Sequence, residues 1–224
     1  MEQQLFTNRL QDLKSQSLSR AVEEQLEQMI LSGELLPGER INESYLSNTL
    51  KISRAPIREA CRQLAQYGMV ENRVGKGSYV RQVNLEEALE LYELRGVLDA
   101  LAAEKASQNA SSEGIAGLGL LVEQMRSFAA RHESTEYFAT NLKFHHQIVQ
   151  LAGSAALIDL YEVVFKKLSL FRQKTLSQPD RLQRSLSQHE GIFAAIQNRD
   201  AQLGSQLARS HVEEAKGVLL ATKV

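Results

Sequence analysis

The chain has 224 residues, of which 43% are hydrophobic and 24% charged, a balance typical of a folded globular protein and too apolar for a disordered one. The net charge of −1 excludes a uniformly basic nucleic-acid coat protein, and the single cysteine excludes both an internal disulfide and a zinc site built from several cysteines. No apolar run reaches the roughly 18 residues that a membrane span needs. The N-terminus also lacks the pattern of a signal peptide, so we expect a cytoplasmic protein with no membrane partner.

Charge divides the chain into two unequal parts. Residues 51–81 contain seven basic and two acidic side chains, whereas residues 84–224 contain 15 basic and 17 acidic ones. A small and locally basic region therefore precedes a larger and slightly acidic one, which an overall charge near zero conceals.

The N-terminal region predicts three helices and a hairpin. A polar arm over 1–16 precedes a helix over 17–32, whose apolar residues recur at helical spacing. A short helix is expected over 43–50, and a third over 53–67, with Ser and Asn at the capping positions. The segment 69–81 has two β-prone runs around Gly-Lys-Gly, which predicts a hairpin. Three helices followed by a hairpin outline a winged helix-turn-helix domain.

The helix over 53–67 has two chemically different faces. Its apolar residues can pack inward, while Arg54, Arg58 and Arg62 recur every four residues on the other side. Such a stripe is more often a solvated helix face, but arginine can also pair with guanine or hold a phosphate. The short preceding helix, the capping Ser53 and the basic hairpin favour DNA binding. The side chains predicted to contact double-stranded DNA are Ser53, Arg54, Arg58, Arg62, Arg73 and Lys76.

Four segments of this region resemble the DNA-binding domain of the GntR family of bacterial transcription regulators. They are 35–43, 52–60, 64–70 and 75–80. The resemblance implies that Arg54 and Arg58 make the recognition-helix contacts and that the tip at 75–77, including Gly77, is a wing that enters the minor groove. One such module covers few base pairs, so we expect a homodimer on a palindromic operator.

The remaining chain reads as helix throughout. Capping residues and Gly or Pro stops predict six helices, at 85–107, 112–131, 134–153, 155–176, 180–198 and 200–220. Their short links favour an antiparallel bundle. We therefore expect a mainly α protein, with a winged helix-turn-helix over 17–81, a linker at 82–84 and an antiparallel bundle of six, or at most seven, helices over 85–224.

Three histidines lie on the apolar faces of three different helices of this bundle. They are His145, His189 and His211. A single histidine in such a place is more often a hydrogen-bonded core residue, because a buried imidazole needs a partner. Three converging imidazoles, with Asn141 one turn before His145, are the arrangement of a metal site inside a helical bundle.

The bundle resembles the FCD ligand-binding domain of the FadR subfamily. The resemblance rests on Asn141 four residues before His145, on His189 and His211 spaced 22 residues apart, and on the segment that ends in Arg95. It implies that Asn141 and the three histidines hold one divalent ion (Zn, Ni or Mn) and that Arg95 and Asn141 line the pocket of a small organic-acid effector. The subfamily more commonly has Asp where this chain has Asn141, so we expect weaker metal retention and a stronger pull on an anionic effector.

Two alternatives stand beside an effector-controlled regulator. In one, the ion itself is the signal; in the other, the metal site belongs to a hydrolase. The hydrolase is disfavoured, because His189-Glu190 lacks the second histidine of a His-Glu-x-x-His helix and neither a P-loop nor a Gly-x-Ser-x-Gly elbow occurs. The sequence thus predicts no enzyme, but a DNA-binding transcription regulator controlled by a small carboxylate at a metal site.

Overall fold

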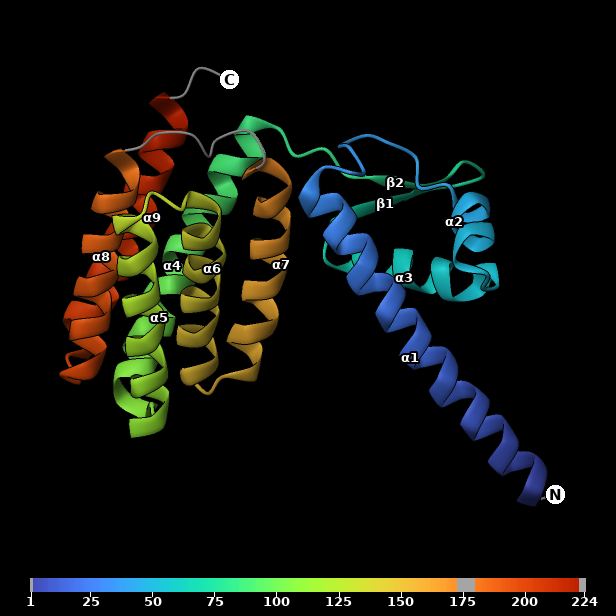
Figure 1. Ribbon diagram of the computed structural model, residues 1–224, viewed down its shortest axis with the longest axis horizontal. Coiled ribbons are helices and arrows are strands. Elements are labelled where there is room, and N and C mark those ends of the chain that lie inside the picture. Colours follow the sequence, from blue (N-terminus) through green and yellow to red (C-terminus); the bar gives the residue numbers. More distant parts are fainter. Residues whose placement is uncertain (1, 173–179, 222–224) are drawn as a thin grey trace. The chain divides into compact units, whose positions relative to one another are not determined.

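The computed structural model describes residues 2–172 and 180–221 and is mainly helical (Figure 1). The chain divides into two compact units, one of Met1–Leu85 with Lys166–Lys174 and one of Glu86–Phe165 with Thr175–Val224. In the part of the chain that the structure describes, no helix is both long and apolar enough to cross a membrane. The predicted fold class, a winged helix-turn-helix followed by a helical bundle, is confirmed.

The first helix is longer than predicted. α1 spans Glu2–Ser32, so residues 2–16 continue a helix where the sequence analysis placed an irregular polar arm. These residues contain no glycine or proline and include several strong helix formers, which favours continuation of the helix. The apolar periodicity over 17–32 marks the buried face, with Val22, Leu26 and Ile30 in the core. The apolar periodicity over 17–32 therefore located a buried face of the helix but not the residue at which the helix begins.

Two short helices and a strand pair complete the N-terminal unit. They are α2 (Glu43–Leu50), α3 (Arg54–Gln66), β1 (Val70–Arg73) and β2 (Gly77–Val80). The side chain of Asn42 caps α2 by accepting a hydrogen bond of 3.0 Å from the Tyr45 amide, as predicted. Ser53 stands at the N-cap position of α3 with an extended backbone, but its side chain forms no capping hydrogen bond.

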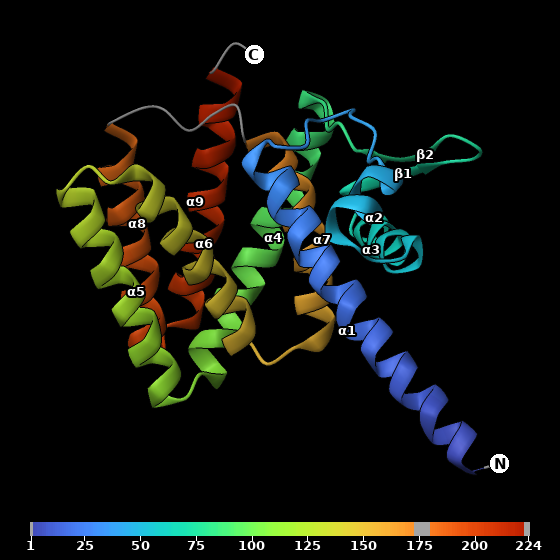
Figure 2. The same ribbon diagram turned by 45° about the vertical axis from the view of Figure 1, so that its right-hand side comes forward.

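The strand pair forms the predicted hairpin (Figure 2). β1 and β2 are antiparallel, with Val70 opposite Val80 and Arg73 opposite Gly77. Gly75 and Gly77 have φ angles of 71° and 95°, values that side-chain-bearing residues rarely adopt, and so the Gly-Lys-Gly sequence can make this tight connection.

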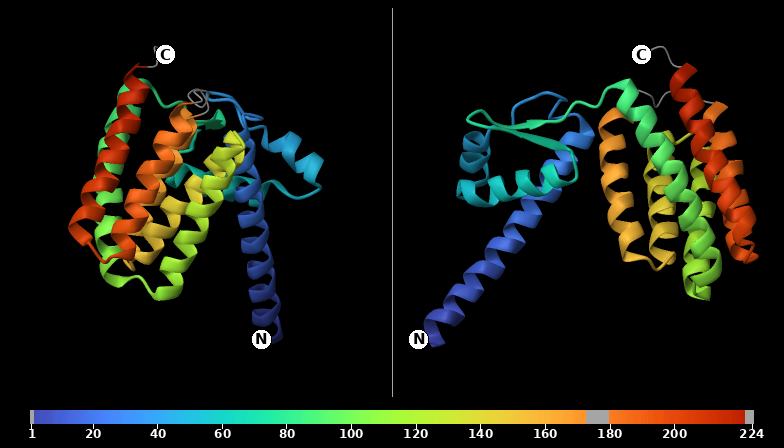
Figure 3. Two further views of the ribbon diagram at one scale, coloured as in Figure 1. Left: turned by 60° about the vertical axis from the view of Figure 1, so that its left-hand side comes forward. Right: turned by 180° about the vertical axis from the view of Figure 1, so that it is seen from behind.

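The six helices predicted after residue 84 are all present. They are α4 (Leu85–Asn109), α5 (Ser112–Ala130), α6 (Ser134–Leu151), α7 (Ala155–Arg172), α8 (Asp180–Gln197) and α9 (Ala201–Ala221). The predicted end of the fourth of these, at residue 176, lies outside the described residues. α4 and α9 run side by side (Figure 3). A side chain added at Gly96 of α4 would meet Val212 of α9.

The core of the bundle combines small and large residues. Alanines of α4 (Ala102, Ala103 and Ala106) pack with large side chains from other helices, such as Tyr137 and Phe144. Polar residues are rarely buried without partners. The buried polar side chains of this unit include Arg95, Asp99, Ser107, Thr140, His145, His189 and His211. These buried polar side chains are the candidates for a functional site in the bundle.

Candidate functional site

α3 has the two faces that the sequence predicts. Pro56, Ile57, Ala60, Cys61 and Leu64 are buried. Arg54, Arg58 and Arg62 are all exposed on the remaining surface of the helix, and Ser53 is exposed at its beginning. The apolar face packs against α1 and α2, and so the arginine stripe is left in solvent.

The three arginines of the stripe differ in their partners. Arg58 Nε donates a 2.7 Å hydrogen bond to Glu43 Oε2 of α2, whereas Arg62 Nη1 donates a 2.8 Å bond to Glu59 of its own helix. Arg54 forms no ion pair with any residue that the structure describes. Arg58 is therefore oriented by a carboxylate of a neighbouring helix, and Arg62 by one of its own helix. Arg54 has no such carboxylate among the described residues.

The hairpin contributes the other predicted DNA-binding residues. Lys76 is exposed at the tip, beside the half-buried Gly77. Arg73 lies with its guanidinium carbon 4.1 Å from the ring centroid of Tyr79 and pairs with Glu71. Lys76 is thus available at the tip, while Arg73 is engaged within the hairpin.

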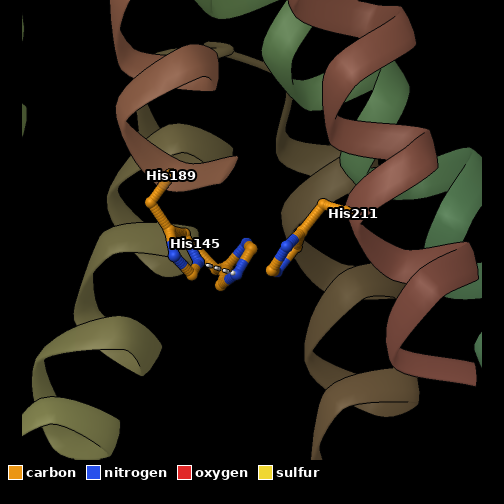
Figure 4. A group of neighbouring side chains, drawn as sticks. All are labelled: His145, His189 and His211. Carbon is orange, nitrogen blue, oxygen red and sulfur yellow. Dashed lines mark hydrogen bonds between the residues drawn. The ribbon is translucent and has the colours of Figure 1, made fainter. Parts of the chain in front are cut away.

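The three predicted histidines converge. His145 from α6, His189 from α8 and His211 from α9 point toward one another (Figure 4) and are all buried. Their ligating nitrogens lie within 4.8 Å of one another. The Nε2 atoms of His145 and His189 are 3.2 Å apart, a distance at which one proton or one cation can lie between them.

Two of the imidazoles have a polar partner on the nitrogen that faces away from the cluster. Asp99 Oδ1 lies 3.6 Å from His145 Nδ1, and Gln188 Oε1 lies 2.7 Å from His211 Nδ1. Because an amide oxygen only accepts hydrogen bonds, His211 Nδ1 carries the hydrogen and its Nε2 keeps its lone pair. The Asp99 carboxylate, at 3.6 Å, is an electrostatic neighbour of His145 Nδ1. Partners of this kind orient metal-ligating histidines.

His189 is oriented in a similar way. Its Nδ1 is hydrogen-bonded to the hydroxyl groups of Ser185 at 3.4 Å and Tyr137 at 3.5 Å, which leaves Nε2 turned to the cluster. Burial, and then the neighbouring His145, hold the pKa of His189 well below its usual range. The ring is therefore neutral at pH 7 and can act as a ligand.

A buried ion pair stands behind His145. Arg95 Nε donates a 2.9 Å hydrogen bond to Asp99 Oδ2, and both side chains are 4% exposed. Burial by itself lowers the pKa of Arg95, but Asp99 and the tyrosines Tyr161 and Tyr92 outweigh it and raise the pKa above its usual range. The guanidinium stays charged, and Asp99 links it to the histidine cluster.

Asn141 has a polar atom whose hydrogen bonding is not satisfied within the described part of the chain. Its Oδ1 is buried and has no hydrogen-bond partner among the described residues. Leaving such an oxygen unpaired costs free energy. Asn141 lies one helical turn before His145 on α6, so both side chains share a face. This unpaired amide oxygen, on the face of α6 that carries His145, has a lone pair that a metal ion could use.

These residues fit a divalent metal ion. Neutral imidazoles suit Zn, Ni and Mn alike, and an amide oxygen can complete the set. Two nitrogens at about 2.1 Å from one ion lie about 3.0 to 3.4 Å apart in octahedral or tetrahedral geometry. The 3.2 Å separation of the His145 and His189 Nε2 atoms falls within this range.

Sequence reasoning missed the residues that orient the histidines. Arg95 and Asp99, like Ser185 and His189, stand four apart on one helix, a spacing that could have indicated a pair. Gln188 adjoins His189 in sequence but serves His211 of another helix, which only the packing of α8 on α9 reveals.

Comparison with known proteins assigns both units to described families. Residues 18–80 match the family described as bacterial regulatory proteins, gntR family, and residues 90–214 match the FCD domain. The first match covers the helix-turn-helix and hairpin, and the second covers the three histidines.

The names of similar proteins agree with this family assignment. The chain is 30% identical over 187 residues to the Nta operon transcriptional regulator of Aminobacter aminovorans, covering 83% of this chain and 87% of that protein. It is 29% identical over 188 residues to the uncharacterized HTH-type transcriptional regulator YdhC of Bacillus subtilis strain 168, covering 84% of each. The solved structure of Escherichia coli McbR/YncC has the same fold, with a TM-score of 0.78 at 19% identity over 92% of this chain and 99% of that one. The chain therefore belongs to the gntR family of bacterial regulatory proteins, as a DNA-binding transcription regulator with an FCD domain and not an enzyme.

Proposed function

We propose that the DNA affinity of this regulator is controlled by a small carboxylate that binds at a divalent metal ion in the FCD domain, as in the FadR subfamily. Asn141, His145, His189 and His211 hold the ion, which is Zn, Ni or Mn. The observation that carries the proposal is the convergence of three buried imidazoles, each with a polar side chain beside its Nδ1. The unpaired oxygen of Asn141 supports it.

Charge favours an anionic effector. Three neutral imidazoles and an amide bring no negative charge to the ion, and the nearest carboxylate, Asp99, is already paired with Arg95. A divalent ion held there supplies open coordination positions with positive charge. Arg95 has further N–H donors beyond the one used by Asp99, and a guanidinium binds carboxylates well. Arg95 and Asn141 are therefore the effector-binding residues of this proposal.

The N-terminal unit reads the operator. α3 presents Arg54, Arg58 and Arg62 to the major groove, Ser53 and Arg73 contact the backbone, and the tip with Lys76 and Gly77 reaches the minor groove. The exposure of the stripe supports this assignment. Two copies bind the two halves of a palindrome, since one module covers few base pairs. The effector changes operator affinity because it binds one of two states of the dimer more tightly.

Elemental analysis of dialysed protein tests the metal part. We expect about one Zn, Ni or Mn per chain, lost in His189→Ala. His132→Asn is the matched control, since His132 is exposed outside the cluster at a φ of 58°, which asparagine tolerates. Protein without metal after reconstitution, or equal metal in both variants, contradicts the site.

Calorimetric titration of the metal-loaded protein with gluconate, pyruvate and butyrate tests the effector part. We expect at least one acid to bind, more weakly in Arg95→Ala. Equal affinity in the two proteins removes Arg95 from the pocket. Operator affinity that changes with the metal alone, and not with any acid, favours the alternative in which the ion is the signal.

A further inference from the structure

The ion pair between Glu43 and Arg58 joins α2 to the arginine stripe of α3. The two residues are 15 positions apart in sequence, and Arg58 Nε lies 2.7 Å from Glu43 Oε2. The side chain of Arg58 is 57% exposed, whereas that of Glu43 is 19% exposed. Glu43 stands in the first turn of α2, whose start is fixed by the Asn42 cap. The carboxylate is thus a fixed anchor and the guanidinium the accessible end of the pair.

We infer that Glu43 is a positioning residue, which holds the guanidinium of Arg58 so that it reads one guanine of the operator. The inference rests on the proposal that α3 enters the major groove. Only Nε of Arg58 is bonded to a described residue, which leaves both Nη groups for a partner outside the protein. Guanine presents two acceptors, O6 and N7, to such a fork.

Among the three arginines of the described stripe, only Arg58 has a guanidinium that a carboxylate orients and two Nη groups without a described partner. Arg62 uses Nη1, one arm of its fork, for Glu59. Arg54 has its whole fork free, but no described carboxylate orients it. An arginine that is already ordered in the free protein loses less conformational freedom when it binds a base. We therefore expect Arg58 to discriminate between base pairs most sharply.

The proposed role has an effect opposite to that of simple electrostatics. A carboxylate beside DNA repels the phosphates, so its removal strengthens binding to every sequence. If Glu43 also orients Arg58, its removal weakens the preference for one base pair at the same time. Affinity and selectivity then change in opposite directions, which separates the two roles.

The test begins with a duplex selected by the full-length wild-type protein from a random-sequence pool. Dissociation constants are then measured by fluorescence anisotropy, at one salt concentration, for this duplex and each single base-pair substitution of it. Arg58→Ala identifies the position that Arg58 reads. Glu43→Gln removes the charge, Glu43→Asp keeps the charge but shortens the side chain, and Glu59→Gln is the control with the same charge change on the Arg62 pair.

We expect Glu43→Gln and Glu43→Asp to lose about tenfold of the discrimination at the position that Arg58 reads, and only there. Glu59→Gln keeps that discrimination. Thermal unfolding confirms that each variant is folded. The inference is overturned if Glu43→Gln changes the affinity for all duplexes by one common factor. If Arg58→Ala itself alters no position, the proposed role of α3 fails, a result distinct from failure of Glu43 alone.

Discussion

The buried pair of Arg95 and Asp99 should be the most costly polar interaction of the bundle to break. Both side chains are 4% exposed, and Arg95 Nε lies 2.9 Å from Asp99 Oδ2. Removing one partner of such a pair leaves a buried charge uncompensated, which costs about 3 to 5 kcal/mol. A domain of ordinary stability has about 5 to 15 kcal/mol in total. We therefore expect Asp99→Leu to lose a large fraction of the stability of the helical unit.

A matched control is present on α9. Arg209 and Glu213 have the same spacing of four residues, but their side chains are 58% and 64% exposed. An exposed pair contributes about 0 to 1 kcal/mol. The expected difference between Asp99→Leu and Glu213→Leu thus comes from burial and not from spacing.

Urea unfolding followed by circular dichroism measures both effects, in buffer with a chelator so that bound metal does not stabilise the folded state. The double variant Arg95→Met with Asp99→Leu should recover most of the loss, because no charge is then left unpaired. The reasoning is refuted if Asp99→Leu lowers the free energy of unfolding no more than Glu213→Leu does. It is also refuted if the double variant is less stable than Asp99→Leu alone.

Four further outcomes follow from three residues. Asn42→Ala should reduce the free energy of unfolding by about 1 kcal/mol in urea titration, because α2 loses its cap. Phe144→Ala should cost about 3 to 5 kcal/mol in the same assay, since Phe144 is fully buried; an effect below 1 kcal/mol would contradict its place in the core. Burial raises the pKa of the Cys61 thiol to about 11, so the native protein should not react with Ellman's reagent at pH 8, whereas the urea-unfolded protein should. Because the unfolded thiol ionises first, the wild type should lose stability relative to Cys61→Ala as the pH rises from about 9 to 11, and a gain there would refute the sign.

Periodicity and capping chemistry were enough to predict most elements. The arginine stripe of α3, the hairpin around Gly75 and Gly77, and the six bundle helices follow from spacing and from turn residues, which act locally. α1 departed from its prediction because residues 2–16, which include several strong helix formers and no glycine or proline, continue the helix.

The sequence by itself also determined that His145, His189 and His211 would face the interior, because each repeats the register of buried apolar residues on its own helix. Only the tertiary structure decided what stands behind each imidazole. Asp99, Gln188 and Tyr137 each lie on a different helix from the imidazole they contact, and their positions depend on how each helix is rotated against its neighbours. Ser185 is the exception, since it lies on the same helix as His189. In the same way, the bond from Glu43 to Arg58 depends on the angle between α2 and α3. Spacing along one helix places residues on a shared face, but contacts between helices depend on side-chain packing across the whole interface.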